Sequence, residues 1–246
     1  MIAVQLNALN PEPPWADLVL AQESAVSYST KPRPYVWRDH VIPIIPIPRR
    51  ETMPRSEVRG SERFLLVSAL TYGRLERALV RDGAALMEAI AAFLAAHSEV
   101  GWLFVGIEDA EVLTRRDATW SPLIAAGRLR WRGYAADLRA IYQHCDIYAQ
   151  LPGTGGGGMG IAMAIAEGLP AVLQAGQGTS AQIAPEHRYV GTDGLFACLA
   201  ALILGGGLRS IAATQLARMV AAHALPAAGE QLLAFVEEAR ALAEAG

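Results

Sequence analysis

The sequence has few of the residues on which several classes of protein depend. Only 2 of its 246 residues are cysteine, too few for a disulfide scaffold or a multi-cysteine zinc site, and two reduced thiols are expected of a cytoplasmic protein. The formal net charge is -3, so there is no net positive field to hold nucleic acid. None of the 5 histidines stands at metal-ligand spacing from a Cys, Asp or Glu, and we therefore expect no metal site.

Long apolar runs and secretion signals are also missing. The longest apolar stretch, residues 195–204, is about half of the ~20 residues that a membrane span needs. No basic segment precedes the apolar start of the chain, so no signal peptide is indicated. There is no Gly-x-Ser-x-Gly motif, which leaves a serine hydrolase without support. We expect a protein with no transmembrane segment, located in the cytoplasm.

The chain is nevertheless built to fold, and its first sixty residues differ from the rest. Hydrophobic residues make up 52% and charged residues 18%, a balance typical of a globular protein with its own core. Eight of the 14 prolines fall before residue 50, and proline disfavours long helices and central strands. We interpret residues 1–60 as a Pro-rich extended arm and linker, with residues 41–48 as its apolar part. Residues 61–246 are predicted to form the main domain with a helical C-terminal tail.

From residue 64 onward, short apolar runs alternate with segments of helical composition. The runs are residues 64–70, 102–105, 128–131, 146–149 and 171–173. The helical segments are residues 84–96, 135–144 and 159–167, followed by the tail from residue 195. This alternation predicts an α/β fold: a Rossmann-like parallel sheet with helices on both faces.

The most informative segment is a run of glycines between a predicted strand and a predicted helix. Five of the six residues 155–160 are glycine. Glycine lets the backbone approach a ligand closely, and the start of the helix offers unpaired N–H groups at the positive end of its dipole. A strand, a glycine loop and a helix in this order predict a site for phosphate or another anion.

A nicotinamide cofactor is one alternative ligand. The loop matches Gly-x-Gly-x-x-Gly twice, but an NAD site also needs an acidic residue about 20 residues on, at the end of the next strand. That strand ends near Gln174, and no Asp or Glu occurs between Glu167 and Glu186. An NAD(P)-binding oxidoreductase therefore remains a remote alternative.

The order of these motifs resembles the donor-binding C-terminal half of GT-B glycosyltransferases of the group 1, family 4-like type. The glycine loop, the short helix and the sequence Glu-Gly-Leu-Pro-Ala-Val at 167–172 carry the resemblance. Upstream, residues 64–75, 102–106, 127–133 and 137–142 are similar to successive family segments. The resemblance covers about residues 60–240. It implies a domain that binds a UDP- or GDP-linked sugar as substrate, without a resident cofactor, and contributes to glycosyl transfer to an unknown acceptor.

The resemblance also implies a set of donor-binding residues. Enzymes that lack a metal stabilise a leaving diphosphate with cations and helix N–H groups, and no Asp-x-Asp motif is present to hold a metal. Three arginines lie where the family places its cations, and a Gly-Tyr turn would border the nucleobase. The whole implied set is Arg74, Arg77, Arg81, Gly106, Gly133, Tyr134, Leu138, Thr154, Gly155, Gly156, Gly157, Gly158, Met159 and Met163. No catalytic residue is identified.

The chain departs from the family in two respects. Gly155 and Met163 stand where many retaining members carry paired glutamates, and Met163 cannot accept a hydrogen bond from a ribose as the second glutamate does. A complete GT-B enzyme has two domains of similar size, but fewer than sixty residues precede the donor-like part. The arm resembles a remnant of a first domain. Three explanations stay open. The chain is a subunit that docks on a separate acceptor-binding partner, or a fragment, or a degenerate module that binds a nucleotide-sugar or a partner without catalysis.

Overall fold

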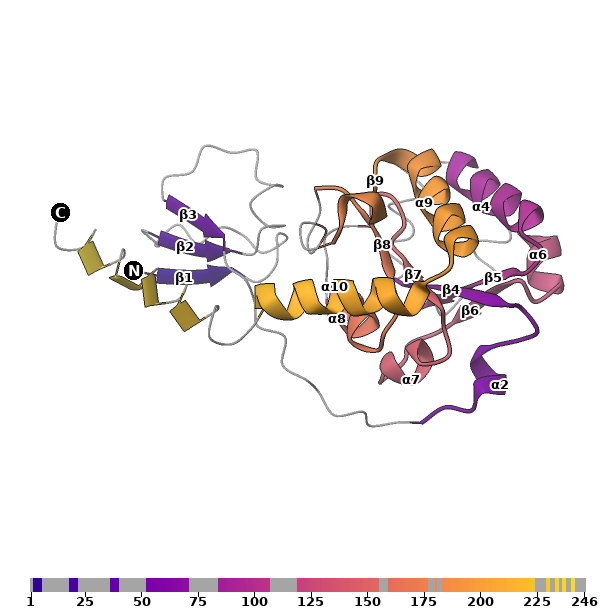
Figure 1. Ribbon diagram of the computed structural model, residues 1–246, viewed down its shortest axis with the longest axis horizontal. Coiled ribbons are helices and arrows are strands. Elements are labelled where there is room, and N and C mark those ends of the chain that lie inside the picture. The colour runs from indigo at the N-terminus through magenta and orange to yellow at the C-terminus, as the bar shows by residue number, and fades with distance from the viewer. Residues whose placement is uncertain are drawn as a thin grey trace. The chain divides into compact units, whose positions relative to one another are not determined.

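The computed structural model describes residues 2–5, 18–21, 36–39, 52–70, 84–106, 119–154, 159–176, 180 and 183–223, with short helical pieces between 229 and 241. The chain divides into two units, Met1–Pro46 with Ala217–Gly246, and Ile47–Leu216. Figure 1 shows the elements of each unit. The larger unit begins ahead of residue 61, where the sequence places the start of the main domain.

The smaller unit contains a parallel sheet that the sequence analysis did not predict. Its strands are β1 (Ile2–Gln5), β2 (Leu18–Ala21) and β3 (Val36–Asp39), in the order β1-β2-β3. β2 is therefore a central strand in a stretch where none was expected. The prolines on which that expectation rested fall between or after the strands, where a missing N–H does not interrupt a ladder. The predicted apolar arm, residues 41–48, lies outside the described residues.

A second parallel sheet, of six strands, forms the centre of the larger unit. It consists of β4 (Phe64–Ala69), β5 (Val100–Val105), β6 (Leu129–Arg132), β7 (Ile147–Ala149), β8 (Ala171–Gln174) and β9 (Arg188–Tyr189). Their order across the sheet is β6-β5-β4-β7-β8-β9, with every neighbouring pair parallel. The five predicted strands are confirmed within one or two residues. The two-residue β9 was missed because a run that short has no hydrophobic period.

Helices cover both faces of this sheet, so the predicted fold class is confirmed (Figure 1). On one face α4 (Ala84–Ala96) and α9 (Gly191–Gly205) bury Leu86, Ile90, Leu195 and Leu199 in the core. The side chains of Trp102 and Phe104 on β5 lie in the same core and stack with ring centroids 5.6 Å apart. The other helices of the unit are α2 (Arg55–Val58), α6 (Ser121–Ala125), α7 (Arg139–Tyr142) and α8 (Met159–Ala166), with the 3-10 turn η2 (Pro185–His187).

Two helix boundaries show how local chemistry sets the elements. The helix expected over 135–144 is shortened to α7, because Asp137 is not helical and its carboxylate accepts the Arg139 backbone N–H at 3.1 Å. α9 ends at Gly205, and the next two residues, Gly206 and Gly207, have φ of +66° and +70°, a region that favours glycine. α10 (Leu208–His223) follows, and within the larger unit its Gln215 amide pairs with both the N–H and the C=O of Ala171, at 2.7 and 3.0 Å.

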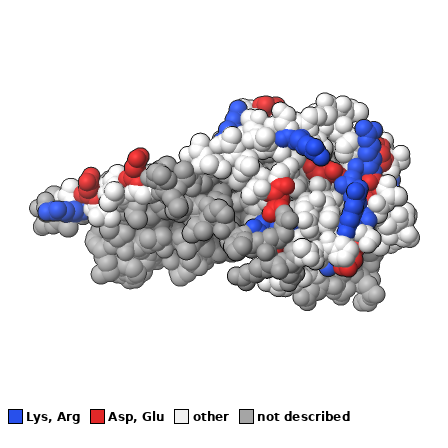
Figure 2. Space-filling view, turned by 60° about the horizontal axis from the view of Figure 1, so that its bottom comes forward, with Lys and Arg blue, Asp and Glu red and all other residues white. Residues whose placement is uncertain are grey.

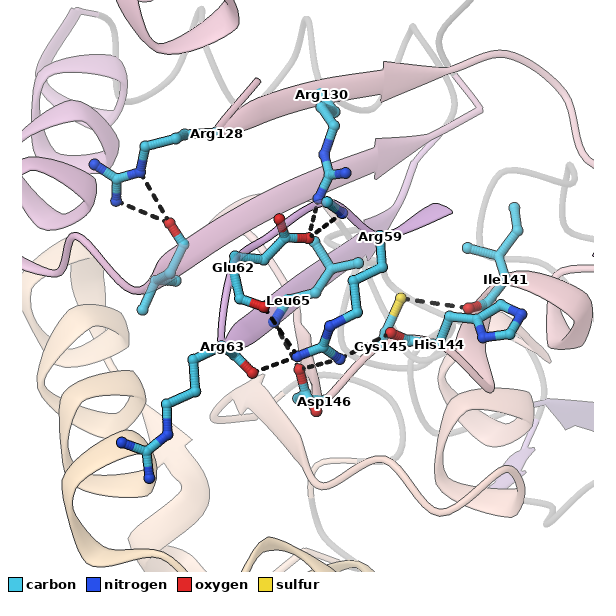
Figure 3. A network of polar contacts seen from close by, with 12 residues as sticks. Arg59, Glu62, Arg63, Leu65, Arg128, Arg130, Ile141, His144, Cys145 and Asp146 are labelled. Carbon is cyan, nitrogen blue, oxygen red and sulfur yellow. Dashed lines mark hydrogen bonds and ion pairs between the residues drawn. The ribbon is translucent and has the colours of Figure 1, made fainter. Parts of the chain in front are cut away.

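A network of charges closes the amino edge of the six-stranded sheet (Figure 3). Arg59, which follows α2, lies 2.7 Å from the Asp146 carboxylate and also donates to the His144 carbonyl at 3.1 Å. Asp146 in turn accepts the N–H of Leu65 at 2.7 Å, and Glu62 pairs with Arg130 of β6. The network fastens the segment that leads into β4 to the starts of β6 and β7.

No helix among the described residues is long and apolar enough to cross a bilayer. On the face shown in Figure 2, basic and acidic side chains are interspersed over the larger unit.

Candidate functional site at the carboxyl edge of the sheet

The strand order places the candidate site between β4 and β7. Numbered in chain order, the six strands of the larger unit run 3-2-1-4-5-6 across the sheet. In such a sheet the connections leave in opposite directions from the first and fourth strands, which opens a crevice at their carboxyl ends where ligands bind. β4 and β7 are those strands, and the glycine loop follows β7. The described residues on either side of the predicted glycine loop, Thr154 and Met159, therefore belong to the connection that leaves the switch point of the sheet.

Gly106 holds the carboxyl ends of three strands together. Its N–H donates to the carbonyls of Arg132 and Gly133, at 2.9 and 3.2 Å. Its φ is +95°, and a Cβ at this position would lie 1.9 Å from the Leu70 carbonyl oxygen. Only glycine permits this approach of the β4 and β5 ends. The donor-binding role predicted for Gly106 and Gly133 stays a prediction; their observed contacts are backbone contacts within the edge.

The described flank of the glycine loop is held by a pair of glutamine side chains. The Gly153 N–H donates to Gln174 Oε1 at 3.0 Å, and the Gln174 N–H donates to Gln150 Oε1, also at 3.0 Å. The Tyr189 hydroxyl donates to the Gln150 carbonyl at 2.6 Å. Gln174 thus occupies the position at which an NAD site carries its acid, and here its side chain fixes the start of the loop.

Thr154 is buried, with 3% of its surface exposed, and its hydroxyl donates to the Leu151 carbonyl at 2.6 Å. The hydroxyl hydrogen is therefore used within the turn, and only its lone pairs are left for a ligand. Residues 155–158 lie outside the described residues, as do Arg74, Arg77 and Arg81. The ligand contacts predicted for all of them stay predictions.

α8 begins directly after the loop and has no acidic residue in its first turn. The first four N–H groups of a helix have no partner within the helix, and its dipole is positive at this end. An anion at the start of α8 is thus not opposed by a carboxylate of the first turn. Met163, one turn along, is half-buried. Glu167 follows the opposite end of α8, and its carboxylate lies 3.9 Å from the guanidinium of Arg139 in α7.

Tyr142 is a residue of this edge that the sequence analysis did not select. It lies in α7, is fully buried, and its hydroxyl has no hydrogen-bond partner among the described residues. A Cβ on Gly160, the second residue of α8, would lie 3.5 Å from this hydroxyl and 3.8 Å from a Leu138 methyl group. Leu138 belongs to the predicted donor-binding set, and Tyr142 stands four residues after it in the segment 137–142 that carries part of the resemblance. The Asp-Leu-x-x-x-Tyr motif that includes both was the signal available.

The burial of Tyr142 also fixes its protonation. Burial raises the pKa of its phenol well above the usual range, and the neighbouring Tyr148 and Cys145 raise it further. The ring of Tyr148 meets that of Tyr142 edge to face, with centroids 6.1 Å apart. Tyr142 is therefore a neutral phenol that keeps its proton to donate.

Tyr134 differs from Tyr142 in its exposure. Tyr134 follows β6 and is 80% exposed, so its ring is free to meet a flat ligand.

One cavity of about 360 Å³ among the described residues lies along β6, lined by Glu57, Leu103, Arg130 and Arg132 among others. Its lining includes none of the predicted donor-binding residues. No group of three His, Cys, Asp or Glu side chains in the described part is placed to hold a metal ion.

Comparison with known proteins identifies the fold of the chain through solved structures. No family model and no curated protein matches the chain. Among solved structures, sucrose-phosphate synthase from Thermosynechococcus elongatus matches 92% of this chain and 59% of its own, with a TM-score of 0.62 and 14% identity. HepE of Anabaena, in complex with UDP, matches 91% of this chain and 64% of its own, with a TM-score of 0.59 and 14% identity.

The pneumococcal O-GlcNAc transferase GtfA, in complex with UDP and GlcNAc, matches 90% of this chain and 45% of its own, with a TM-score of 0.58 and 14% identity. The chain thus has the fold of GT-B glycosyltransferases, and the resemblance stated from the sequence is confirmed at the level of fold. The chain spans 45–64% of the length of these three proteins.

Proposed function

We propose that the chain is the donor-binding part of a metal-independent GT-B glycosyltransferase. It binds a nucleotide-diphosphate sugar, with UDP or GDP as the nucleotide, at the carboxyl edge between β4 and β7. It contributes to transfer of the sugar to an acceptor held by another domain or subunit. The observation that carries this proposal is the start of α8, free of acidic residues, directly after a glycine loop at the switch point of a GT-B sheet.

In the proposed site the diphosphate lies over the first turn of α8. The backbone N–H groups of the glycine loop and of this turn donate to its oxygens, and Arg74, Arg77 and Arg81 supply positive charge. These interactions strengthen as the leaving diphosphate gains charge in the transition state, which is how such groups accelerate transfer without a metal. Gly133 and Tyr134 border the base, and the exposed ring of Tyr134 suits stacking on it.

The solved structures of GT-B fold support a nucleotide as ligand, because two of those cited were determined with UDP bound. An oxidoreductase is less well supported. Gln174 stands in place of the acid that an NAD site needs, and its side-chain oxygen accepts the Gly153 N–H. A ribose hydroxyl would have to compete with that bond.

A second candidate function is a module that binds a nucleotide-sugar or a partner without catalysing transfer. Met163 favours it, because its thioether replaces the carboxylate that holds the ribose in many retaining members. A non-catalytic module and a catalytic domain share the same binding site. They differ in whether sugar is transferred.

Binding is tested by isothermal titration calorimetry with UDP, GDP, their sugar conjugates and NAD. We expect a nucleoside diphosphate to bind and NAD not to bind. Gly156→Val and Gly158→Val should abolish binding with the circular dichroism spectrum unchanged. Gly205→Val is the matched control, since a Cβ there meets nothing within 4 Å. Binding of NAD alone, or binding that survives both loop substitutions, would refute the proposal.

Catalysis is tested separately, by release of UDP or GDP from the sugar donor that binds best. The assay is run with and without candidate acceptors and an acceptor-binding partner protein. Turnover that depends on the loop glycines supports the enzyme. Tight binding with no turnover under any of these conditions favours the non-catalytic module.

A further inference from the structure

Tyr142 carries a polar group whose burial the fold itself does not explain. The side chain is completely buried, and its hydroxyl has no partner among the described residues. An unpaired buried hydroxyl costs free energy, whereas phenylalanine would fill nearly the same space without that cost. In contrast, the buried Tyr189 hydroxyl of the same unit donates to the Gln150 carbonyl at 2.6 Å. The unpaired state of the Tyr142 hydroxyl therefore calls for a partner from outside the described chain.

The position of the hydroxyl indicates the chemistry of that partner. It lies against Gly160 in the first turn of α8, where any side chain would come into contact with it. This is the positive end of the helix, next to N–H groups without helical partners. All of these groups are donors. The complementary partner is an acceptor with negative charge, and a phosphate oxygen fits both requirements.

We propose that Tyr142 is a binding residue of the anion site and that its hydroxyl donates a hydrogen bond to the phosphate bound at the start of α8. The proposal rests on the proposed function and adds one side chain to its site. The hydroxyl is closed to solvent without ligand, so the bond forms as the anion enters and the first turn adjusts to it. Because the phenol is neutral, it donates without bringing a second negative charge to the phosphate.

The test compares Tyr142→Phe with the wild-type chain, using UDP and inorganic pyrophosphate as probes in calorimetry. Removing one hydrogen bond to a charged group should weaken the binding of both probes about tenfold. Tyr148→Phe is the matched control, since its ring meets Tyr142 in the same core, and it should leave both affinities unchanged. The urea midpoint of ligand-free Tyr142→Phe should equal or exceed that of the wild type, since no bond within the protein is lost.

Each outcome decides the question. If the wild type binds neither probe, the proposed function fails and this inference fails with it. If the wild type binds and Tyr142→Phe binds equally well, only this inference fails. A loss for UDP but not for pyrophosphate would place the hydroxyl away from the phosphates and overturn the proposal. A lower urea midpoint for the ligand-free variant would show that the hydroxyl is already bonded within the protein, and would also overturn it.

Discussion

Substituting Gly106 with alanine should cost far more stability than the same change at other glycines of positive φ. A Cβ on Gly106 would lie 1.9 Å from the Leu70 carbonyl oxygen, and contacts below 3.0 Å essentially never occur for real Cβ atoms. The ends of β4 and β5 would have to separate by about 1 Å in a close-packed sheet. The φ of +95° adds strain for any residue with a Cβ.

Gly127 isolates the part of this cost that comes from backbone conformation. Its φ is +67°, and a Cβ there meets nothing within 4 Å. Gly127→Ala should therefore cost only the left-handed penalty of about 1–2 kcal/mol. Gly106→Ala adds the clash with the Leu70 carbonyl, and moving residue 106 away from it strains the hydrogen bonds that its N–H donates to Arg132 and Gly133, for a total of about 4 kcal/mol or more.

Urea unfolding followed by circular dichroism measures both variants. We expect the Gly106→Ala midpoint to fall at least twice as far as the Gly127→Ala midpoint. Fluorescence and hydrogen exchange of Gly106→Ala, measured without urea, should show changes confined to the carboxyl ends of β4, β5 and β6. If the two variants unfold at the same urea concentration, the close approach at Gly106 does not constrain the sheet and our reasoning about this edge is wrong.

Three further predictions concern groups that hold the larger unit together. Gln215→Met should destabilise it by about 2–3 kcal/mol in urea, because both backbone groups of Ala171 lose their partner. Gln215→Glu should recover part of the loss only at acidic pH, because only a protonated carboxyl can both accept from the N–H and donate to the C=O of Ala171. Asp146→Asn should cost about 2 kcal/mol, since the Arg59 guanidinium loses its counter-charge, and the cost should not shrink in 1 M salt as it would for an exposed pair. Burial raises the pKa of the Cys145 thiol, so above about pH 9 the unfolded chain loses this proton before the folded chain does, and stability falls by up to about 1.4 kcal/mol per pH unit. Cys145→Ala should reduce this dependence of stability on alkaline pH, and an unchanged dependence would show that Cys145 is not its cause.

The part of the fold that could be predicted is the part in which a strand is buried on both faces. β4 and β5 are six residues each and almost wholly buried, and that burial appears in the sequence as an apolar run. β1, β2 and β3 have only four residues each and stand among prolines. A pattern that short has no readable period, so their pairing was settled by contacts distant in the sequence.

The candidate site was predictable to the same extent. The glycine loop and the start of α8 are neighbours in sequence, so their combination could be read directly. The bond from Gly153 to Gln174 joins residues 21 apart, and Tyr142 meets Gly160 only because α7 and α8 pack together. Contacts of this kind depend on tertiary pairing, and a core tyrosine has the same sequence pattern whether its hydroxyl is bonded or not.

Met163 allows the nucleotide part of the site to be tested apart from the phosphate part. In the family that the chain resembles, a glutamate at this position holds the ribose, and a thioether cannot replace it. The diphosphate should then provide most of the affinity, so UDP should bind only modestly more tightly than pyrophosphate. Met163→Glu restores an acceptor one turn along α8 and should tighten UDP about fivefold, a typical gain for one hydrogen bond, without tightening pyrophosphate.

The contrast between the two probes is what makes the substitution informative. A new carboxylate close to the phosphates would repel UDP and pyrophosphate alike, whereas a carboxylate beside the ribose favours only the ligand that has one. Calorimetric titrations of the wild type and of Met163→Glu, each with UDP and with pyrophosphate, give the four affinities needed. If Met163→Glu weakens UDP and pyrophosphate by the same factor, residue 163 faces the phosphates rather than the ribose, and the nucleoside lies elsewhere on this edge than the resemblance implies.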